Sequence, residues 1–429
     1  MSYKVMDWKK IKNDLLLVSF SHFLYKIIGY SVLTILTRYL TKGEMGEFFF
    51  AVSISSFFAL FTQLGTDNYL VREAAAKPSQ ALQRFSEIVT VRLLLFILYF
   101  ILLNGFIITF KSELSEVVFL TSIYIILEQL YNTFGSLFVG VKQVKYNVIS
   151  GVVSRIFLVG IIYLIIRLNG SLTTIIICYI VANTLLVVIS VLLLKWKIGS
   201  FKLTFKLNSA FKILQESFPL FILTLLGLIL FKIDTLMLGF IKSYPIVAAY
   251  EAAYKLFEAS QFLIMPLGMI FSPIFSEMAS NSNWVEILRY VKKILIILTI
   301  IGSFTALLVI TTAGYIIPFV FGDKYPDSIS ILKILYLTVP VLYLANINII
   351  LAKSIFLEKK AIKILLISTI LNILLNSFSI PLWGAIGAAW ATFISETILA
   401  VVIIKMNLNE LRFQISKVPV KLMRVLDHA

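Results

Sequence analysis

Long apolar runs, separated by short polar and basic segments, recur along the whole chain. One of the clearest covers residues 219–241, which are mostly Leu, Ile and Phe. About twenty helical residues, rising 1.5 Å each, cross a hydrocarbon core of roughly 30 Å. A segment in lipid must also satisfy its own backbone hydrogen bonds, which favours helices. The pattern therefore predicts an all-α polytopic membrane protein.

The hydropathy pattern divides the chain into two halves of six spans. The predicted spans cover residues 15–38, 48–64, 89–110, 117–139, 148–166, 172–194, 219–241, 248–270, 294–319, 331–352, 361–380 and 386–404. The predicted domains are an N-terminal six-helix half (1–194), a cytoplasmic basic linker (195–218), a C-terminal six-helix half (219–404) and a cytoplasmic basic tail (405–429). Residues 38–59 and 239–259, which join the first two spans of each half, are weakly similar. Internal repeats of this kind are typical of transporters, so we expect twelve transmembrane helices in two halves around a central cavity.

Charge indicates how the chain is oriented. The net charge is +16, although only 14% of the residues are charged. With both termini cytoplasmic, about 26 Lys and Arg residues fall on the cytoplasmic side and about six on the other. Basic loops orient membrane proteins and attract anionic lipids. We therefore expect two cytoplasmic termini and membrane lipids as partners, and no binding of nucleic acid.

The residue types exclude several kinds of chemistry. The chain has one cysteine, Cys178, and two histidines, His22 and His428, so it lacks the residues for a disulfide or a cysteine metal cluster. It contains no glycine-rich phosphate loop, HExxH pattern or nucleophile elbow. We expect no enzyme, no metal site and no cofactor other than a coupling H⁺ or Na⁺.

Ionisable residues inside the spans are the candidate functional residues. A charge at mid-bilayer costs several kcal/mol or more, so it usually faces a bundle interior or a water-filled cavity. The predicted substrate-binding residues are Lys26, Arg92, Arg155, Lys232 and Lys255. The predicted ion-coupling residues are Glu128, Asp234 and Glu396.

Structural alternatives stay open for some of these charges. Glu251, Lys255 and Glu258 follow each other at i, i+4 and i+7, so they share one helical face and can satisfy one another. Arg92 and Lys333 lie near span ends, where a long basic side chain can reach the interface. Bases outnumber acids within the first-half spans, and acids outnumber bases within the second. A cavity lined by the first half would favour an anion, whereas the acids of the second half could hold a proton or Na⁺. The charge count does not choose between these two readings.

Seven segments, in order along nearly the whole chain, resemble one family. They are TRYLTKGEMGEFFFA, LGTDNYLVREAA, LFVGVKQVKYNVISGVVSRIF, ESFPLFILTLLGLILFKIDTLMLGF, YEAAYKLFEA, FVFGDKYPDSISILKIL and PLWGAIGAAWATFISE. This series resembles the polysaccharide (O-antigen and capsule repeat-unit) flippases of the multidrug/oligosaccharidyl-lipid/polysaccharide exporter superfamily. The acidic second half departs from the cationic cavity that the resemblance implies, and it leaves the coupling ion open.

The resemblance implies a flippase of the bacterial cytoplasmic membrane. Its substrate would be an undecaprenyl-diphosphate-linked glycan, moved to the outer leaflet by alternating access. The implied protein partners are a polysaccharide polymerase and chain-length proteins. A cation-coupled multidrug exporter of the same superfamily is the first alternative. A membrane polysaccharide polymerase is the second, but its catalytic Arg or His would need a larger outer loop than this chain offers.

Overall fold

The computed structural model describes residues 27–204, 207–261 and 264–417. These residues form helices and turns and contain no strand. Eight of the described helices are long and apolar enough to cross a membrane. The prediction of an all-α polytopic membrane protein is therefore confirmed.

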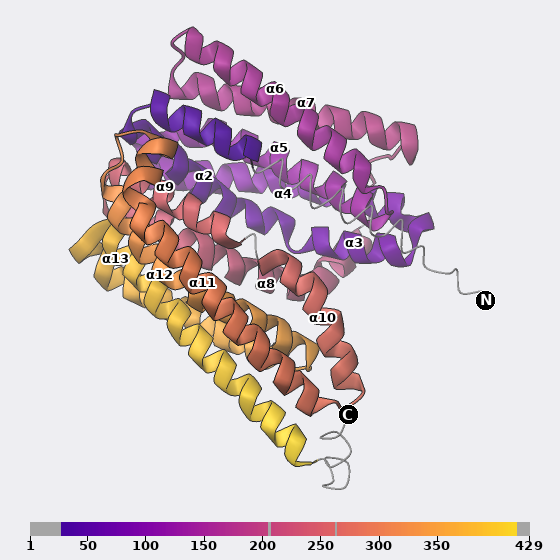
Figure 1. Ribbon diagram of the computed structural model, residues 1–429. Helices are drawn as coiled ribbons and strands as arrows, with labels where there is room; N and C mark the ends of the chain where they lie inside the picture. Colours follow the sequence, from indigo (N-terminus) through magenta and orange to yellow (C-terminus); the bar gives the residue numbers. More distant parts are fainter. Residues whose placement is uncertain (1–26, 205–206, 262–263, 418–429) are drawn as a thin grey trace. The chain divides into compact units, whose positions relative to one another are not determined.

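The chain forms two compact units, Met1–Lys232 (unit 1) and Ile233–Ala429 (unit 2). The described helices of unit 1 cover Ile27–Tyr39, α2 (Lys42–Gln63), α3 (Thr66–Ala76), α4 (Ala81–Phe110), α5 (Ser115–Gly140), α6 (Val144–Arg167) and α7 (Leu172–Lys197). Short 3₁₀ turns η1 (Pro78–Gln80) and η2 (Ser112–Leu114) precede α4 and α5. In Figure 1, α6 and α7 lie side by side, which agrees with their packing.

Helix α8 (Leu207–Ile241) contains the division between the units. Unit 2 continues with α9 (Tyr244–Ser260), α10 (Ile264–Ser280), α11 (Trp284–Phe321), α12 (Asp327–Ser354) and α13 (Glu358–Ser416). Helices α11, α12 and α13 pack together as neighbours (Figure 1). The division lies inside a helix, whereas the sequence-based domain prediction placed a linker at 195–218.

Helix α13 contains both of the last two predicted spans. Its backbone leaves the helical region at Gly384, with φ 57° and ψ −132°, shortly after Pro381. Glycine adopts a positive φ at little cost. Proline has no backbone N–H, so it interrupts the i→i−4 hydrogen bonds of the preceding helix. Residues 358–383 and 385–416 are thus two helices joined at a kink, and they complete the twelve-helix layout that was predicted.

The second predicted span of the first half is broken into two helices. Between α2 and α3, Leu64 and Gly65 both take left-handed conformations, with φ of 44° and 75°. In unit 2, the residues of the corresponding span belong to α9 and α10. The sequence-based prediction placed residues 65–88 wholly outside the membrane, but α3 and the first turns of α4 occupy this segment. Thr66 and Asp67, which that prediction assigned to a loop, are buried among the helices.

The described part of the predicted linker packs against α4. Ser86 Oγ donates a hydrogen bond to the carbonyl oxygen of Lys202, and Thr204 N donates one of 3.1 Å to Thr90 Oγ1. The ring of Phe201 lies 5.1 Å from that of Phe85, measured between centroids. These contacts fix the non-helical residues after α7 to the side of unit 1.

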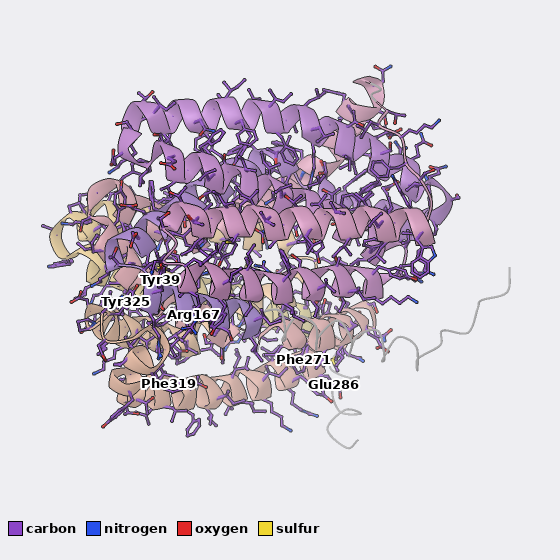
Figure 2. All side chains as sticks on the ribbon, turned by 90° about the horizontal axis from the view of Figure 1, so that it is seen from above. Tyr39, Arg167, Phe271, Glu286, Phe319 and Tyr325 are labelled. Atoms are coloured by element: carbon purple, nitrogen blue, oxygen red, sulfur yellow. The ribbon has the colours of Figure 1, made fainter. Side chains whose placement is uncertain are left out.

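Two tyrosines, Tyr39 in unit 1 and Tyr325 in unit 2, lie close to helix ends. Figure 2 shows Tyr39 and Arg167 close together at one end of unit 1, where Tyr39 donates a 2.8 Å hydrogen bond to the carbonyl oxygen of Gly170. Tyr325, in the turn between α11 and α12, is 1% exposed, and burial raises the pKa of its hydroxyl. The Tyr325 hydroxyl therefore remains protonated at neutral pH.

Candidate functional site

A buried carboxylate, Asp234 of α8, lies at the centre of a polar cluster in unit 2. Its side chain accepts hydrogen bonds from Tyr250 Oη at 2.5 Å, Asn376 Nδ2 at 2.6 Å and Thr392 Oγ1 at 2.8 Å. Asp234 is 2% exposed. The three donors come from α9 and from the two parts of α13. Four helical segments thus meet at one carboxyl group.

The cluster continues through side-chain amides on α13. Asn376 Nδ2 also donates to Asn372 Oδ1 at 3.1 Å, and Asn372 Nδ2 donates to Ser395 Oγ at 3.1 Å. Asn376 Oδ1 is buried and accepts no hydrogen bond within the described residues. No basic side chain of the described part pairs with Asp234. Among the described residues, the cluster therefore offers a buried carboxylate without a basic partner, beside a buried amide oxygen that is free to accept.

A proton or Na⁺ suits this cluster better than a transition metal does. An uncompensated buried carboxylate is costly, and protonation or a bound cation removes that cost. Oxygen ligands are those that hard cations prefer. The described residues contain no group of three His, Cys, Asp or Glu side chains that could hold a metal ion.

The other acids of unit 2 differ in how they are satisfied. Glu251, fully buried on α9, accepts a hydrogen bond from Thr235 Oγ1. Lys255 Nζ lies 2.8 Å from Glu258 Oε2. Of the three charges that the sequence placed on one face of this helix, Lys255 and Glu258 thus form an ion pair. Glu396, half-buried on α13, makes no hydrogen bond or ion pair with any described residue.

Arg92 forms a buried ion-pair cluster at the break between α2 and α3. Its Nη2 atom lies 2.8 Å from Asp67 Oδ1, and both Nε and Nη2 donate to Thr66 Oγ1 at 3.2 and 3.0 Å. Nη1 donates to the carbonyl oxygen of Gln129 at 3.1 Å and to Thr133 Oγ1. The side chain of Arg92 is 1% exposed. The interpretation that Arg92 snorkels to the interface is therefore wrong, because its charge is satisfied inside unit 1.

Glu128 and Arg155 form a second, looser pair between α5 and α6. Arg155 Nη2 lies 3.6 Å from Glu128 Oε1, and the side chains are 14% and 30% exposed. Beside them, the ring of Tyr179 lies 5.3 Å from that of Tyr124 and 5.6 Å from that of Phe48. Glu128 is therefore not the lone charge that its sequence context indicated.

The remaining predicted residues are placed as follows. Lys26 lies outside the described residues. Lys232 is half-buried on α8, two residues before Asp234. Lys333, near the start of α12, is exposed, which fits a side chain that reaches the interface. The candidates whose contacts are described above therefore belong to different units: Arg92 and the Glu128–Arg155 pair lie in unit 1, whereas Asp234 and Lys255 lie in unit 2.

Sequence reasoning missed most of the neutral partners. Asn372, Asn376 and Ser379 recur at i, i+4 and i+7 in an otherwise apolar span, a spacing that places them on one helical face. That pattern was the available signal for the Asp234 cluster. Asp67 was missed because it was assigned to a cytoplasmic segment.

Comparison with known proteins defines the class. The fold matches a lipid II flippase MurJ in an inward closed conformation, with a TM-score of 0.72, 17% identity and coverage of 95% of this chain and 88% of the other. It also matches an inward-facing multidrug resistance MATE family transporter of the MOP superfamily, with a TM-score of 0.69, 12% identity and coverage of 92% and 96%. The protein thus has the fold of MOP-superfamily membrane transporters.

The sequence identifies the family within that class. Residues 11–279 match the family model described as polysaccharide biosynthesis protein, so the chain belongs to this family. A relative from Escherichia coli (strain K12), named "Putative O-antigen transporter", is 23% identical over 267 residues. That alignment covers 61% of this chain and 63% of the relative, so it spans less than two thirds of either. These relatives are named as transporters and flippases, not as catalysts.

Proposed function

We propose that this protein moves undecaprenyl-diphosphate-linked oligosaccharide repeat units across the bacterial cytoplasmic membrane by alternating access, for synthesis of a surface polysaccharide. The observation that carries the proposal is the family match over residues 11–279. The likeness of the fold to a lipid II flippase supports it, because that protein is also named for a lipid-linked cargo. The diphosphate and sugars cannot cross a hydrocarbon layer unaided, since burying unpaired charge is prohibitive.

Basic side chains inside the spans would replace water around the substrate's phosphates. Lys26, Arg155, Lys232 and Lys255 remain predicted ligands, because lysine and arginine bind phosphate through charge-assisted hydrogen bonds. Arg92 is less suited to this role, since Asp67, Thr66 and Thr133 already occupy its guanidinium group. Its contacts instead favour a structural role, in which Arg92 stabilises the junction between α2 and α3.

Asp234 is the best candidate for coupling transport to an H⁺ or Na⁺ gradient. Its buried carboxylate has neutral donors but no basic partner among the described residues, so a mobile cation can neutralise it. Glu128 is the weaker candidate because Arg155 lies beside it. Glu396 remains a second candidate on α13.

We further propose that both termini are cytoplasmic, and that polysaccharide polymerase and chain-length proteins act on the same repeat units after they reach the outer leaflet. The charge bias of the loops supports the orientation. The protein partners follow from the proposed role in polysaccharide synthesis.

A cation-coupled multidrug exporter is the second candidate, favoured by the MATE-type fold and by the acids of unit 2. Proteoliposomes containing the purified protein separate the two functions. We expect radiolabelled undecaprenyl-diphosphate-linked oligosaccharide to move between leaflets and a fluorescent organic cation to stay in place. Transport of the cation without movement of the lipid-linked glycan would contradict the proposal.

A further inference from the structure

The segment that joins α7 to α8 combines lysines with large exposed apolar side chains. Residues 195–215 contain five lysines and no acidic residue. Trp196, Leu203 and Phe211 are 71%, 57% and 70% exposed. The lysines of this segment that the structure describes are exposed as well: Lys195, Lys197, Lys202 and Lys212. The surface of the segment is therefore both basic and apolar.

The backbone of this segment excludes a place in the hydrocarbon core. Residues 199–204 have no regular secondary structure. Such backbone does not face acyl chains, because its N–H and C=O groups would lack partners there. Exposed Trp, Leu and Phe side chains beside lysines are typical of segments at the level of the lipid headgroups. The segment therefore fits the interface between membrane and water.

Contacts with α4 hold the segment in place. Ser209 Oγ donates a 2.7 Å hydrogen bond to Glu87 Oε2. Arg84 Nη1 donates to the same carboxylate at 2.9 Å and to Ser209 Oγ at 3.1 Å. Ile213 belongs to the buried apolar cluster of unit 1, and Phe201 packs against that cluster. The exposed residues are thus presented by a fixed backbone, so little ordering entropy opposes binding.

The charges near this surface favour an anionic partner. The side chain of Glu87 is 3% exposed and pairs with Arg84, so its charge is compensated inside unit 1. Lys197 Nζ lies 3.1 Å from the centroid of the Trp196 ring. This cation–π contact brings an ammonium group and a large apolar ring to the same place. A molecule that carries an anionic group next to an apolar part matches both.

We propose that residues 195–212 form a docking surface for anionic phospholipids of the cytoplasmic leaflet. The ammonium groups would contact the lipid phosphates, and Trp196, Leu203 and Phe211 would enter the boundary between headgroups and acyl chains. A soluble acidic protein would meet only the headgroup side of this interface. A second copy of this chain would bring an equally basic surface, which repels. The inference rests on the proposed orientation and is independent of the cargo.

Fluorescence of Trp196 in lipid vesicles tests this surface. In the reporter protein, the full-length chain keeps Trp196 as its only tryptophan through four changes: Trp8→Phe, Trp284→Phe, Trp383→Phe and Trp390→Phe. The vesicles contain equal amounts of phosphatidylglycerol and phosphatidylcholine, with brominated acyl chains on one lipid or the other. At low salt, we expect brominated phosphatidylglycerol to bind beside Trp196 about fivefold more strongly than brominated phosphatidylcholine, the effect of roughly one lysine near a charged headgroup.

Variants made in the reporter protein assign the preference to the lysines. Lys195→Gln with Lys197→Gln should remove most of the preference while both lipids still quench Trp196, because the apolar side chains remain. The ratio of the two quenching curves cancels any direct effect of Lys197 on Trp196 fluorescence. Lys195→Arg with Lys197→Arg keeps the charge and should keep the preference. The matched control is Lys360→Gln, which changes an exposed lysine 3.7 Å from Glu410 in unit 2 and should leave the preference unchanged.

Each other outcome overturns the proposal. Equal quenching by both lipids in the reporter protein, or an unchanged preference in the glutamine variant, would show that these lysines do not select anionic lipid. Absence of quenching by either lipid would place Trp196 away from the acyl chains and would favour an acidic protein as the partner. No glycan takes part in the measurement, so these results leave the proposed transport function untouched.

Discussion

Asn376 donates a 2.6 Å hydrogen bond to Asp234, which lies 142 residues earlier in the chain. The contact joins α13 to α8 inside unit 2. It pairs the buried carboxylate with a neutral amide, whereas a permanent ion pair would join it to lysine or arginine. A carboxylate held by neutral donors can gain and lose a cation without breaking a salt bridge, which is what gradient coupling requires.

Replacing Asp234 by Asn should stop turnover while substrate still binds. The amide imitates the protonated carboxyl group in shape and charge, so the protein is held in its neutral form. Transport of the lipid-linked glycan in proteoliposomes, measured with and without proton and sodium gradients, tests this. Asp323→Asn, an exposed change in the turn after α11, is the control and should transport normally. Normal transport by Asp234→Asn, together with insensitivity to both gradients, would mean that the carrier is uncoupled.

Arg92→Ala should strongly destabilise the protein. Removing one member of a buried ion pair leaves the other charge uncompensated, at a cost of about 3–5 kcal/mol. Thermal unfolding in detergent measures the loss. The control is Lys212→Ala, which breaks an exposed pair of 4.0 Å with Glu216 and should cost less than about 1 kcal/mol. Equal melting temperatures for the two variants would show that the Arg92 cluster does not hold the helix break.

Hydropathy predicted the spans because a bilayer imposes length and apolarity on every crossing segment. It failed where local backbone geometry decided the outcome. The left-handed conformations at Leu64 and Gly65 break one span, and Asp67 on the following helix is buried. The pattern of apolar residues does not predict such a break. Single charges such as Asp234 were found because they interrupt apolar runs. Their neutral partners, such as Thr392, were not, because lone threonines are common in membrane helices.

Lys26→Ala should abolish polysaccharide export while leaving the amount of protein unchanged. Lys26 lies outside the described residues, but its sequence context places it near the middle of the first predicted span with no acid at i+3 or i+4. Such a charge is expected to meet substrate phosphate or a sugar acid. Lys26→Arg keeps the charge and should retain part of the activity. Full export by the alanine variant, measured as surface polysaccharide in a strain lacking the native gene, would remove this role.

The predicted orientation can be tested with single cysteines. The native Cys178 is buried, so a membrane-impermeant maleimide should not label it. A cysteine replacing Lys324, in the turn between α11 and α12, should react in intact cells. A cysteine replacing Lys202, after α7, should react only once the membrane is permeabilised. Labelling at position 202 in intact cells would place this segment outside the cell and would contradict the predicted cytoplasmic termini.

Two glycines of α11 provide a matched test of helix packing in unit 2. A Cβ atom at Gly302 would lie 2.7 Å from the Cα atom of Pro340 on α12, whereas a Cβ atom at Gly314 would meet no atom within 4 Å. Gly302→Ala must therefore push α11 and α12 apart, at a cost typical of overpacking, about 1–3 kcal/mol.

Gly314→Ala should instead be neutral or raise stability by up to about 1 kcal/mol, since alanine favours the helix. The two variants make the same chemical change in the same helix, so membrane insertion and expression affect them alike. Their difference in melting temperature isolates the close approach of α11 to Pro340. Indistinguishable melting curves would mean that α11 and α12 do not pack at this distance in the membrane.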